Sequence, residues 1–229
     1  TFAVKNNPSE NYVFQNVDGR GLYISQLYDI GFCQSDPDKM VAGAQDNHIM
    51  KNGYNQGWVC KGDFAGDGYN VNIHPTIPDY AYFIMGSGDL PSKVLRTKDG
   101  FITNSDNILN LTLNDNSGYN EKPISLKPGD PSVAYVGYQN VYKSPDWNSN
   151  FNLFFDRTTK ADSLIQNELI VDIAIAPSNS NVMYVAYDHC CWQNAYSDIA
   201  RTTNANDNTP VWTTIPNALL SGYPVSCRI

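Results

Sequence analysis

The sequence repeats itself: three short markers follow one another in a fixed order, four times along the chain. The first marker is an apolar run ending at a proline turn, the second an aromatic or β-branched run, and the third a cation before a polar turn. The turn prolines are Pro37, Pro75, Pro128 and Pro177, and the cations are Lys51, Arg96, Lys143 and Arg201. Because turn residues separate short strand-like runs, each period predicts four antiparallel strands.

A four-stranded period of roughly 40 to 50 residues has the size of a β-propeller blade. We therefore predict an all-β fold, a β-propeller built of four-stranded antiparallel blades, with about four full blades in a single propeller segment covering residues 1–229. The blade-like repeats are expected at residues 29–64, 69–115, 122–158 and 170–216, with further strands at 11–17 and 223–229. Since the larger propellers need more blades to close, we interpret the chain as part of a larger propeller. The alternative is a small propeller in which the end strands meet.

The turn after the second cation carries a family resemblance. Arg96-Thr97-Lys98-Asp99-Gly100 resembles the Asp-box of bacterial-neuraminidase-type repeats, whose usual form is Ser/Thr-x-Asp-x-Gly-x-x-x-Trp. Together with Gln45-Asp46-Asn47, Gly66-Asp67-Gly68 and Ile73-His74-Pro75, it is similar to secreted Asp-box propellers of Bacteroidetes-type bacteria. That superfamily holds sialidases, xyloglucan-active glycosidases and sortilin-type receptors. The resemblance implies a secreted or cell-surface propeller.

The polar residues of the cation-marked turns are predicted to be structural, because short side-chain hydrogen bonds from such residues satisfy turn backbone groups. These residues are Thr97, Asp99, Ser144, Asp146 and Asn204. Trp58 and Trp212, which follow two of the turns, are expected to pack between neighbouring sheets. In folds of this resemblance the ligand face lies at the opposite end of the blades.

That opposite face collects the loops between second and third strands and the loops between blades. Amides, carboxylates and exposed aromatic rings there suit the hydroxyl groups and apolar faces of sugars. The candidate ligand-binding residues are Gln45, Asp46, Asn47, Asp67, Gln139, Asn140, Glu168 and Trp192. The alternative is that these Asp and Asn residues only make turns.

Two function classes follow. The first is a non-catalytic extracellular binding module whose partner is a glycan or an extracellular protein. The second is a xyloglucanase-like glycoside hydrolase, which needs two carboxylates roughly 5 to 10 Å apart. Asp46 and Asp67 are the best such pair by position. A sialidase is disfavoured, because Arg96 and Arg201 are committed to the repeat rather than to a cluster that binds a substrate carboxylate.

Charge and hydropathy narrow the partners further. The net charge of −8 and pI near 4.7 argue against a nucleic acid, whose phosphates would be repelled. No apolar run approaches the length of a membrane-spanning helix, so no membrane insertion is expected.

The cysteines and histidines predict no metal or cofactor. Five cysteines, an odd number, exclude a complete set of disulfides within the chain. Cys33 and Cys227 share an aliphatic register and are expected to be buried thiols, while Cys60 lies near Trp58 and Cys190 adjoins Cys191. The histidines His48, His74 and His189 offer no paired ligand spacing. His189-Cys190-Cys191 could bind a metal, but a local disulfide or plain buried thiols are favoured.

Overall fold

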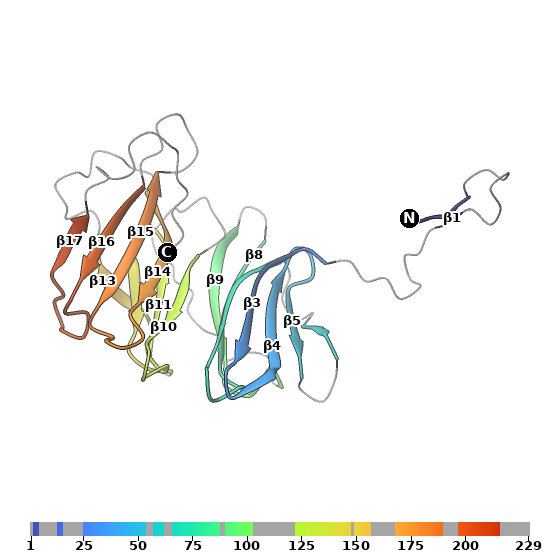
Figure 1. Ribbon diagram of the computed structural model, residues 1–229, viewed down its shortest axis with the longest axis horizontal. Coiled ribbons are helices and arrows are strands. Elements are labelled where there is room, and N and C mark those ends of the chain that lie inside the picture. The colour runs from blue at the N-terminus through green and yellow to red at the C-terminus, as the bar shows by residue number, and fades with distance from the viewer. Residues whose placement is uncertain are drawn as a thin grey trace.

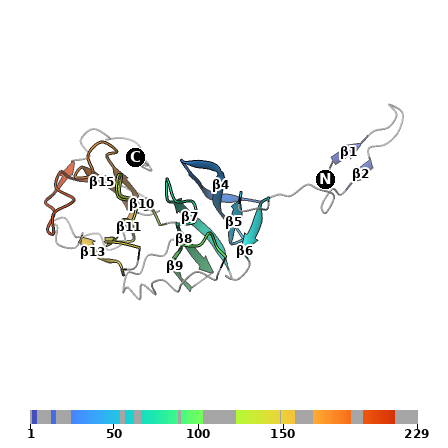
Figure 2. The same cartoon turned by 90° about the horizontal axis from the view of Figure 1, so that it is seen from below.

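The computed structural model describes residues 2–4, 13–15, 25–53, 57–61, 66–87, 90–102, 122–147, 149–156, 168–189 and 197–215. Within these ranges the chain forms strands and turns and no helix, so no helix there is long and apolar enough to cross a membrane. Four antiparallel sheets succeed one another in chain order, as Figure 1 shows from one side and Figure 2 from below. A fifth, two-stranded sheet joins β1 (Phe2–Val4) to β2 (Val13–Gln15).

Each sheet is a meander in which every strand pairs with the next one in the sequence. The first sheet consists of β3 (Leu27–Cys33), β4 (Asp36–Ala44), β5 (Ile49–Asn52) and β6 (Val59–Lys61), and the second of β7 (Asp67–Ile73), β8 (Ala81–Ser87) and β9 (Leu90–Thr97). The third consists of β10 (Ile124–Leu126), β11 (Ala134–Gly137), β12 (Val141–Ser144) and β13 (Asn152–Phe155), and the fourth of β14 (Glu168–Ile175), β15 (Met183–His189), β16 (Ser197–Thr202) and β17 (Trp212–Ile215). The fourth strand expected before residue 115 lies outside the described residues.

The predicted fold class is confirmed: the chain is an all-β propeller segment of about four blades. The first strands of the sheets contact one another in order, β3 with β7, β7 with β10 and β10 with β14. These are the inner strands expected from the proline markers. They place one edge of each of these four sheets along a common axis, while the later strands lie farther out.

Three apolar cores fill the spaces between consecutive sheets. Cys33, Val41 and Ile49 of the first sheet pack against Val71 and Phe83 of the second. The other two cores, between the second and third sheets and between the third and fourth, are built in the same way from alternate strand residues. Since side chains alternate between the two faces of a strand, each middle sheet contributes to two cores. Burial between sheets, rather than inside one globular centre, therefore stabilises the fold.

Two glycines allow the first and second sheets to approach closely. A Cβ atom on Gly43 would collide with the carbonyl oxygen of Tyr69, and one on Gly68 would collide with the carbonyl oxygen of His48. Backbone therefore meets backbone at this end of the two sheets. No other residue type fits at these positions without moving one sheet away from the other.

The tryptophans show where the sequence interpretation was right and wrong. Trp212 packs against the third core beside Phe155, with ring centroids 4.6 Å apart, as predicted. Trp58 is 43% exposed and does not pack between sheets, so that prediction is wrong. Trp147, which the repeat pattern did not single out, is buried and stacks on Tyr82 with centroids 4.6 Å apart. Its place in the turn after β12 puts it between the second and third sheets.

The thiols of the described residues are free. Cys33 is fully buried in the first core, as expected, and its thiol donates to the carbonyl oxygen of Pro75 at 3.1 Å. Cys60 is exposed on β6. Cys190, Cys191 and Cys227 lie outside the described residues, so their states remain predictions.

Candidate functional site

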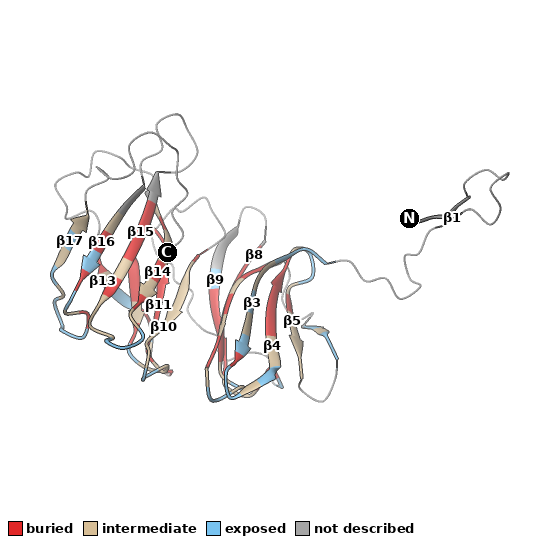
Figure 3. Ribbon diagram, in the orientation of Figure 1, coloured by how far each residue is buried: buried red, intermediate tan, exposed pale blue. Residues whose placement is uncertain are grey.

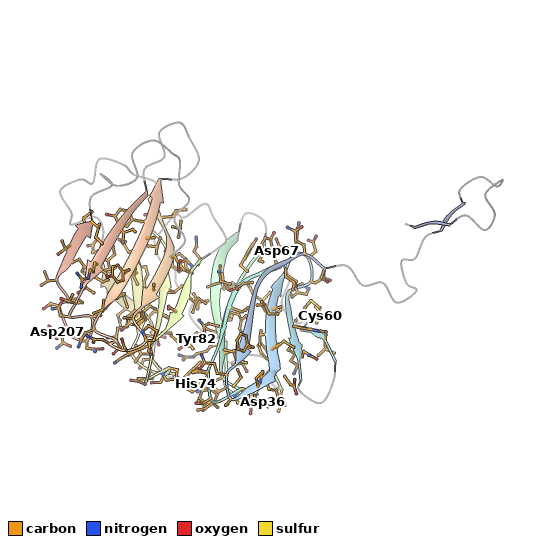
Figure 4. The ribbon with its side chains drawn as sticks, viewed as in Figure 1. Asp36, Cys60, Asp67, His74, Tyr82 and Asp207 are labelled. Carbon is orange, nitrogen blue, oxygen red and sulfur yellow. The ribbon has the colours of Figure 1, made fainter. Side chains whose placement is uncertain are left out.

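The sheets have two unlike ends. We call the mouth end the one that carries the β4–β5 turn, the β11–β12 turn and Asp67, and the turn end the one that carries the proline turns and the turns after β9, β12 and β16. Figure 4 shows Asp67 at one end of the sheets, with Asp36 and His74 at the other. The candidate ligand-binding residues that the structure describes belong to the mouth end.

The β4–β5 turn is tight. The Ala44 amide donates to the His48 carbonyl oxygen at 3.0 Å, and the Gln45 amide donates to the Gln26 carbonyl oxygen at 2.9 Å. Asp46 and His48 each adopt a positive φ of 57°, a conformation that short polar side chains tolerate best. Asp46 and Asn47 are exposed at the tip of this turn, while Gln45 is half-buried.

Asp67 ties this turn to the second sheet. Its Oδ1 accepts a hydrogen bond from the Asp46 amide at 2.7 Å, and its Oδ2 accepts one from the Tyr69 hydroxyl at 3.1 Å. His48 also forms a parallel bridge with Asp67. Asp46 and Asp67 are therefore neighbours, as expected. However, the Asp67 carboxylate is occupied on both oxygens, which the sequence did not indicate.

The remaining candidates lie on other sheets. Gln139 and Asn140 form the half-buried β11–β12 turn, where the Tyr138 amide donates to the Asn140 carbonyl oxygen at 2.8 Å. The second sheet separates this turn from the β4–β5 turn. Glu168 begins β14, where its backbone pairs with His189, and its side chain is outside the description. Trp192 lies outside the described residues. The structure thus brings Gln45, Asp46, Asn47 and Asp67 together as one cluster.

A groove along the inner strands was not predicted. Its volume is about 640 Å³, and it runs along β3, β7 and β10 to the proline turns, lined by Ile30, Phe32, Ile73, Leu126, Lys127 and Pro177 among others. Asp29, at its wall, accepts from the amides of Ile30 at 2.8 Å and Val71 at 3.0 Å, and so links two inner strands. Of its apolar lining residues, Ile30 and Phe32 are exposed, whereas Ile73 is buried in the core between the first and second sheets.

The polar residues of the turn end are structural, as predicted. The Thr97 hydroxyl donates to Asp99 Oδ1 at 2.9 Å and accepts from the Phe101 amide at 3.1 Å. After β12, Asp146 accepts from the amide and hydroxyl of Ser149 at 2.8 and 2.7 Å. After β16, Asn204 repeats the role, accepting from the Thr202 hydroxyl at 2.8 Å and the Val211 amide at 2.9 Å.

His74 is a buried titratable group at the turn end. Its Nδ1 accepts hydrogen bonds from the amides of Thr76 at 3.1 Å and Ile77 at 3.0 Å, and its ring lies 6.0 Å from that of Trp147. Burial lowers the pKa of His74 below its ordinary value of 6.5, because the charged form loses hydration. No group of three or more His, Cys, Asp or Glu side chains in the described ranges could hold a metal ion.

These features define the class of protein as a β-propeller, and comparison with solved structures agrees. The Niastella koreensis GH74 enzyme matches 84% of this chain with a TM-score of 0.53 and 13% sequence identity. This chain spans 30% of that enzyme's length. YCF48 from Cyanidioschyzon merolae matches 84% of this chain and 72% of its own, with a TM-score of 0.44 and 17% identity. At such identities the likeness to the enzyme shows the fold alone. No protein-family model and no curated protein matches the sequence.

Proposed function

We propose that this chain is an extracellular or cell-surface binding module that recognises a glycan or an extracellular protein through the loops of its mouth end, without catalysis by this segment. The observation that carries the proposal is the state of Asp67, whose two carboxylate oxygens accept from the Asp46 amide and the Tyr69 hydroxyl. A carboxylate held in this way positions the neighbouring turn. The exposed side chains of Asp46 and Asn47 are then presented on a fixed backbone, which lowers the entropic cost of binding.

We further propose that the chain belongs with secreted Asp-box repeat propellers and forms part of a larger propeller. The support lies in the turn end, where a Ser or Thr is followed two residues later by an Asp or Asn in three sheets: Thr97 and Asp99, Ser144 and Asp146, Thr202 and Asn204. In each case the pair serves the turn through short hydrogen bonds. A repeated structural turn leaves ligand contact to the other end of the sheets.

The alternative function is a xyloglucanase-like glycoside hydrolase that uses Asp46 and Asp67 as its carboxylate pair. The closeness of these two residues across two sheets is the observation that favours it. The GH74 label of the Niastella enzyme agrees with this alternative, but at 13% identity that likeness concerns the fold. The occupied oxygens of Asp67 weigh against it, since a glycosidase carboxylate must be able to give or take a proton or attack the sugar.

A glycan array and a hydrolysis screen with β-glucans and xyloglucan separate the two functions. For a binding module, Asp46→Asn reduces the free energy of ligand binding by about 1.5 to 3 kcal/mol, the value of a charge-assisted hydrogen bond. In that case no variant releases sugar. Asp67→Asn also weakens binding. Unlike Asp46→Asn it lowers the thermal stability as well, because it loosens the β4–β5 turn. For a hydrolase, the unmodified chain releases sugar, and one of these changes lowers turnover by orders of magnitude with affinity nearly kept.

Asp38→Asn is the matched control, because Asp38 is also exposed but lies at the opposite end of β4. It should change neither binding nor turnover. If both Asp46→Asn and Asp67→Asn leave the ligand affinity unchanged, these residues do not form the ligand site. If the unmodified chain releases sugar and Asp67→Asn abolishes turnover, the function is that of a hydrolase and not of a binding module.

A further inference from the structure

Two tyrosines lie side by side where the first and second sheets meet at the mouth end. The ring centroids of Tyr28, on β3, and Tyr69, on β7, are 4.9 Å apart, and the two ring planes differ by 41°. Tyr69 is 6% exposed and belongs to the core between the second and third sheets, whereas Tyr28 is half-buried and packs against that core. Tyr28 is therefore the ring of this pair that a ligand can reach.

Both tyrosines stand at irregularities of their strands. The pairing register of β3 shifts at Tyr28, and that of β7 shifts at Tyr69 and Asn70. A β-bulge of this kind re-aims a side chain out of the regular alternation, and bulges are over-represented next to active sites. β14 has the same irregularity at Val171. Among these three first strands the bulge thus recurs, but it carries a tyrosine only in the two sheets that hold Asp46 and Asp67.

The hydroxyl of Tyr69 connects the tyrosine pair to the β4–β5 turn. It donates to Asp67 Oδ2 at 3.1 Å, and Asp67 Oδ1 accepts from the Asp46 amide at 2.7 Å. The main chains approach closely as well, since a Cβ atom on Gly43 would collide with the Tyr69 carbonyl oxygen. The two rings and the turn therefore form one continuous, tightly packed structure.

The β4–β5 turn is also tied to β3. The Gln45 amide donates to the carbonyl oxygen of Gln26, two residues before Tyr28, at 2.9 Å. Residues 41–44, which lead into the turn, are buried and belong to the red part of β4 in Figure 3. The ring of Tyr28 and the polar tip of the turn therefore lie at the same end of the first sheet, on a fixed base.

The chemistry of this cluster suits a sugar. The face of an aromatic ring packs against the C–H groups of a pyranose, while carboxylate and amide oxygens, here those of Asp46 and Asn47, accept from its hydroxyl groups. A protein interface of ordinary size instead buries about 800 Å² on each partner around an apolar core. One half-buried ring beside a carboxylate and an amide has the scale of one or two sugar units.

We propose that the ligand of the mouth end is a glycan and that one of its sugar rings stacks on Tyr28 while its hydroxyl groups bind Asp46 and Asn47. The proposal rests on the binding function proposed above and selects a glycan rather than a protein as the partner. Tyr28 was not a candidate from the sequence, because a tyrosine in a strand resembles any core residue until its bulge is seen. Since both rings belong to the contact between the first and second sheets, further blades of a larger propeller would leave this contact in place.

Titration of the 229-residue chain with soluble xyloglucan and β-glucan, and with the neutral glycans that it binds on an array, tests the proposal. Tyr28→Phe keeps the flat ring and should change the Kd by no more than about twofold. Tyr28→Leu keeps an apolar side chain but loses the flat face. It should raise the Kd about tenfold or more, which corresponds to about 1.4 kcal/mol.

Tyr80→Leu is the matched control, because Tyr80 is also half-buried against the same core but lies at the turn end. It should leave the Kd unchanged. Thermal unfolding shows whether each variant is folded. Nuclear magnetic resonance of the unmodified chain adds a test that needs no folded variant besides Tyr28→Phe, which assigns the ring signals. The ring-proton signals of Tyr28 should shift when the glycan is added, and those of Tyr80 should not.

The outcomes separate this proposal from the binding function itself. A glycan that Tyr28→Leu binds with unchanged Kd, or that leaves the Tyr28 signals unshifted, overturns the stacking on Tyr28 and leaves the binding module standing. Equal losses from Tyr28→Phe and Tyr28→Leu also overturn it, because they assign the effect to the hydroxyl group. Binding to none of the glycans overturns this proposal and leaves an extracellular protein as the partner of the binding module.

Discussion

The turn end and the mouth end use the same residue types in opposite ways. At the turn end, Asp146 and Asn204 each follow a hydroxyl side chain by two residues. Their side-chain oxygens accept hydrogen bonds from amides and hydroxyls of their own turn. At the mouth end, Asp46 has no such predecessor and stands exposed at a turn tip. An acidic side chain is therefore structural or available according to its immediate neighbours, and Asp67 is a structural exception at the mouth end.

The largest expected effect is on stability at the turn end. Replacing the buried Trp147 by Ala empties the space against Tyr82 and should cost about 3 to 5 kcal/mol, measured by denaturant unfolding. Trp58→Ala removes a ring of the same size that is 43% exposed and should cost much less. Equal losses from the two would mean that burial does not distinguish these tryptophans.

The comparison of carboxylates is sharper. Asp146→Ala deprives the Ser149 amide and hydroxyl of their acceptor and should cost about 1 to 3 kcal/mol. Asp46→Asn, at the mouth end, should change the free energy of unfolding by no more than about 0.5 kcal/mol, because the side chain is exposed and asparagine also tolerates the positive φ of 57°. A loss from Asp46→Asn as large as that from Asp146→Ala would contradict the difference between the two ends.

The smallest effect is a dependence on pH at the turn end. His74 Nδ1 is an acceptor of two amides, and a protonated ring cannot accept. Because its pKa is lowered in the folded chain, the unfolded chain takes up the proton first. The contribution of His74 to the free energy of unfolding is therefore complete above pH 6.5. This contribution is lost as the pH falls below 6.5 towards the pKa of the folded state.

His74→Asn supplies the control for that measurement, since an amide oxygen can accept from the same amides without titrating. Thermal unfolding across this pH range should show a shallower decline for His74→Asn than for the unmodified chain. An identical decline would assign the dependence to other groups.

The sequence predicted the sheets because strand alternation and turn residues are local signals that recur with the repeat. It could not predict which faces are covered. Trp58 and Trp212 both follow a third-strand turn, yet Trp212 meets Phe155 of the preceding sheet, whereas Trp58, at 43% exposure, belongs to none of the cores between described sheets. Whether a residue is buried depends on the sheet that packs against it as much as on the residue itself. The sequence of one repeat does not say which sheet that is.

The candidate site at the mouth end could likewise be predicted only in part. Loop order alone placed Asp46 near Asp67, because the second-to-third-strand loop and the loop to the next blade share one end of the sheets. The hydrogen bonds that occupy Asp67 depend on the positive φ of Asp46 and on the Tyr69 hydroxyl, and neither is visible in a pattern of polar residues. The groove along the inner strands escaped for a similar reason, since it lies between strands distant in the sequence.

The close approach at Gly43 and Gly68 bears on how many blades can complete a circle. A fan of sheets closes when the angles between neighbours add up to a full turn, and that angle depends on how near two sheets come at each contact. At these glycines the limit is set by main-chain atoms alone. One methyl group at either position would act as a wedge and alter the angle between the first two sheets. The number of blades needed to close such a propeller therefore depends partly on whether glycine stands at contacts of this kind.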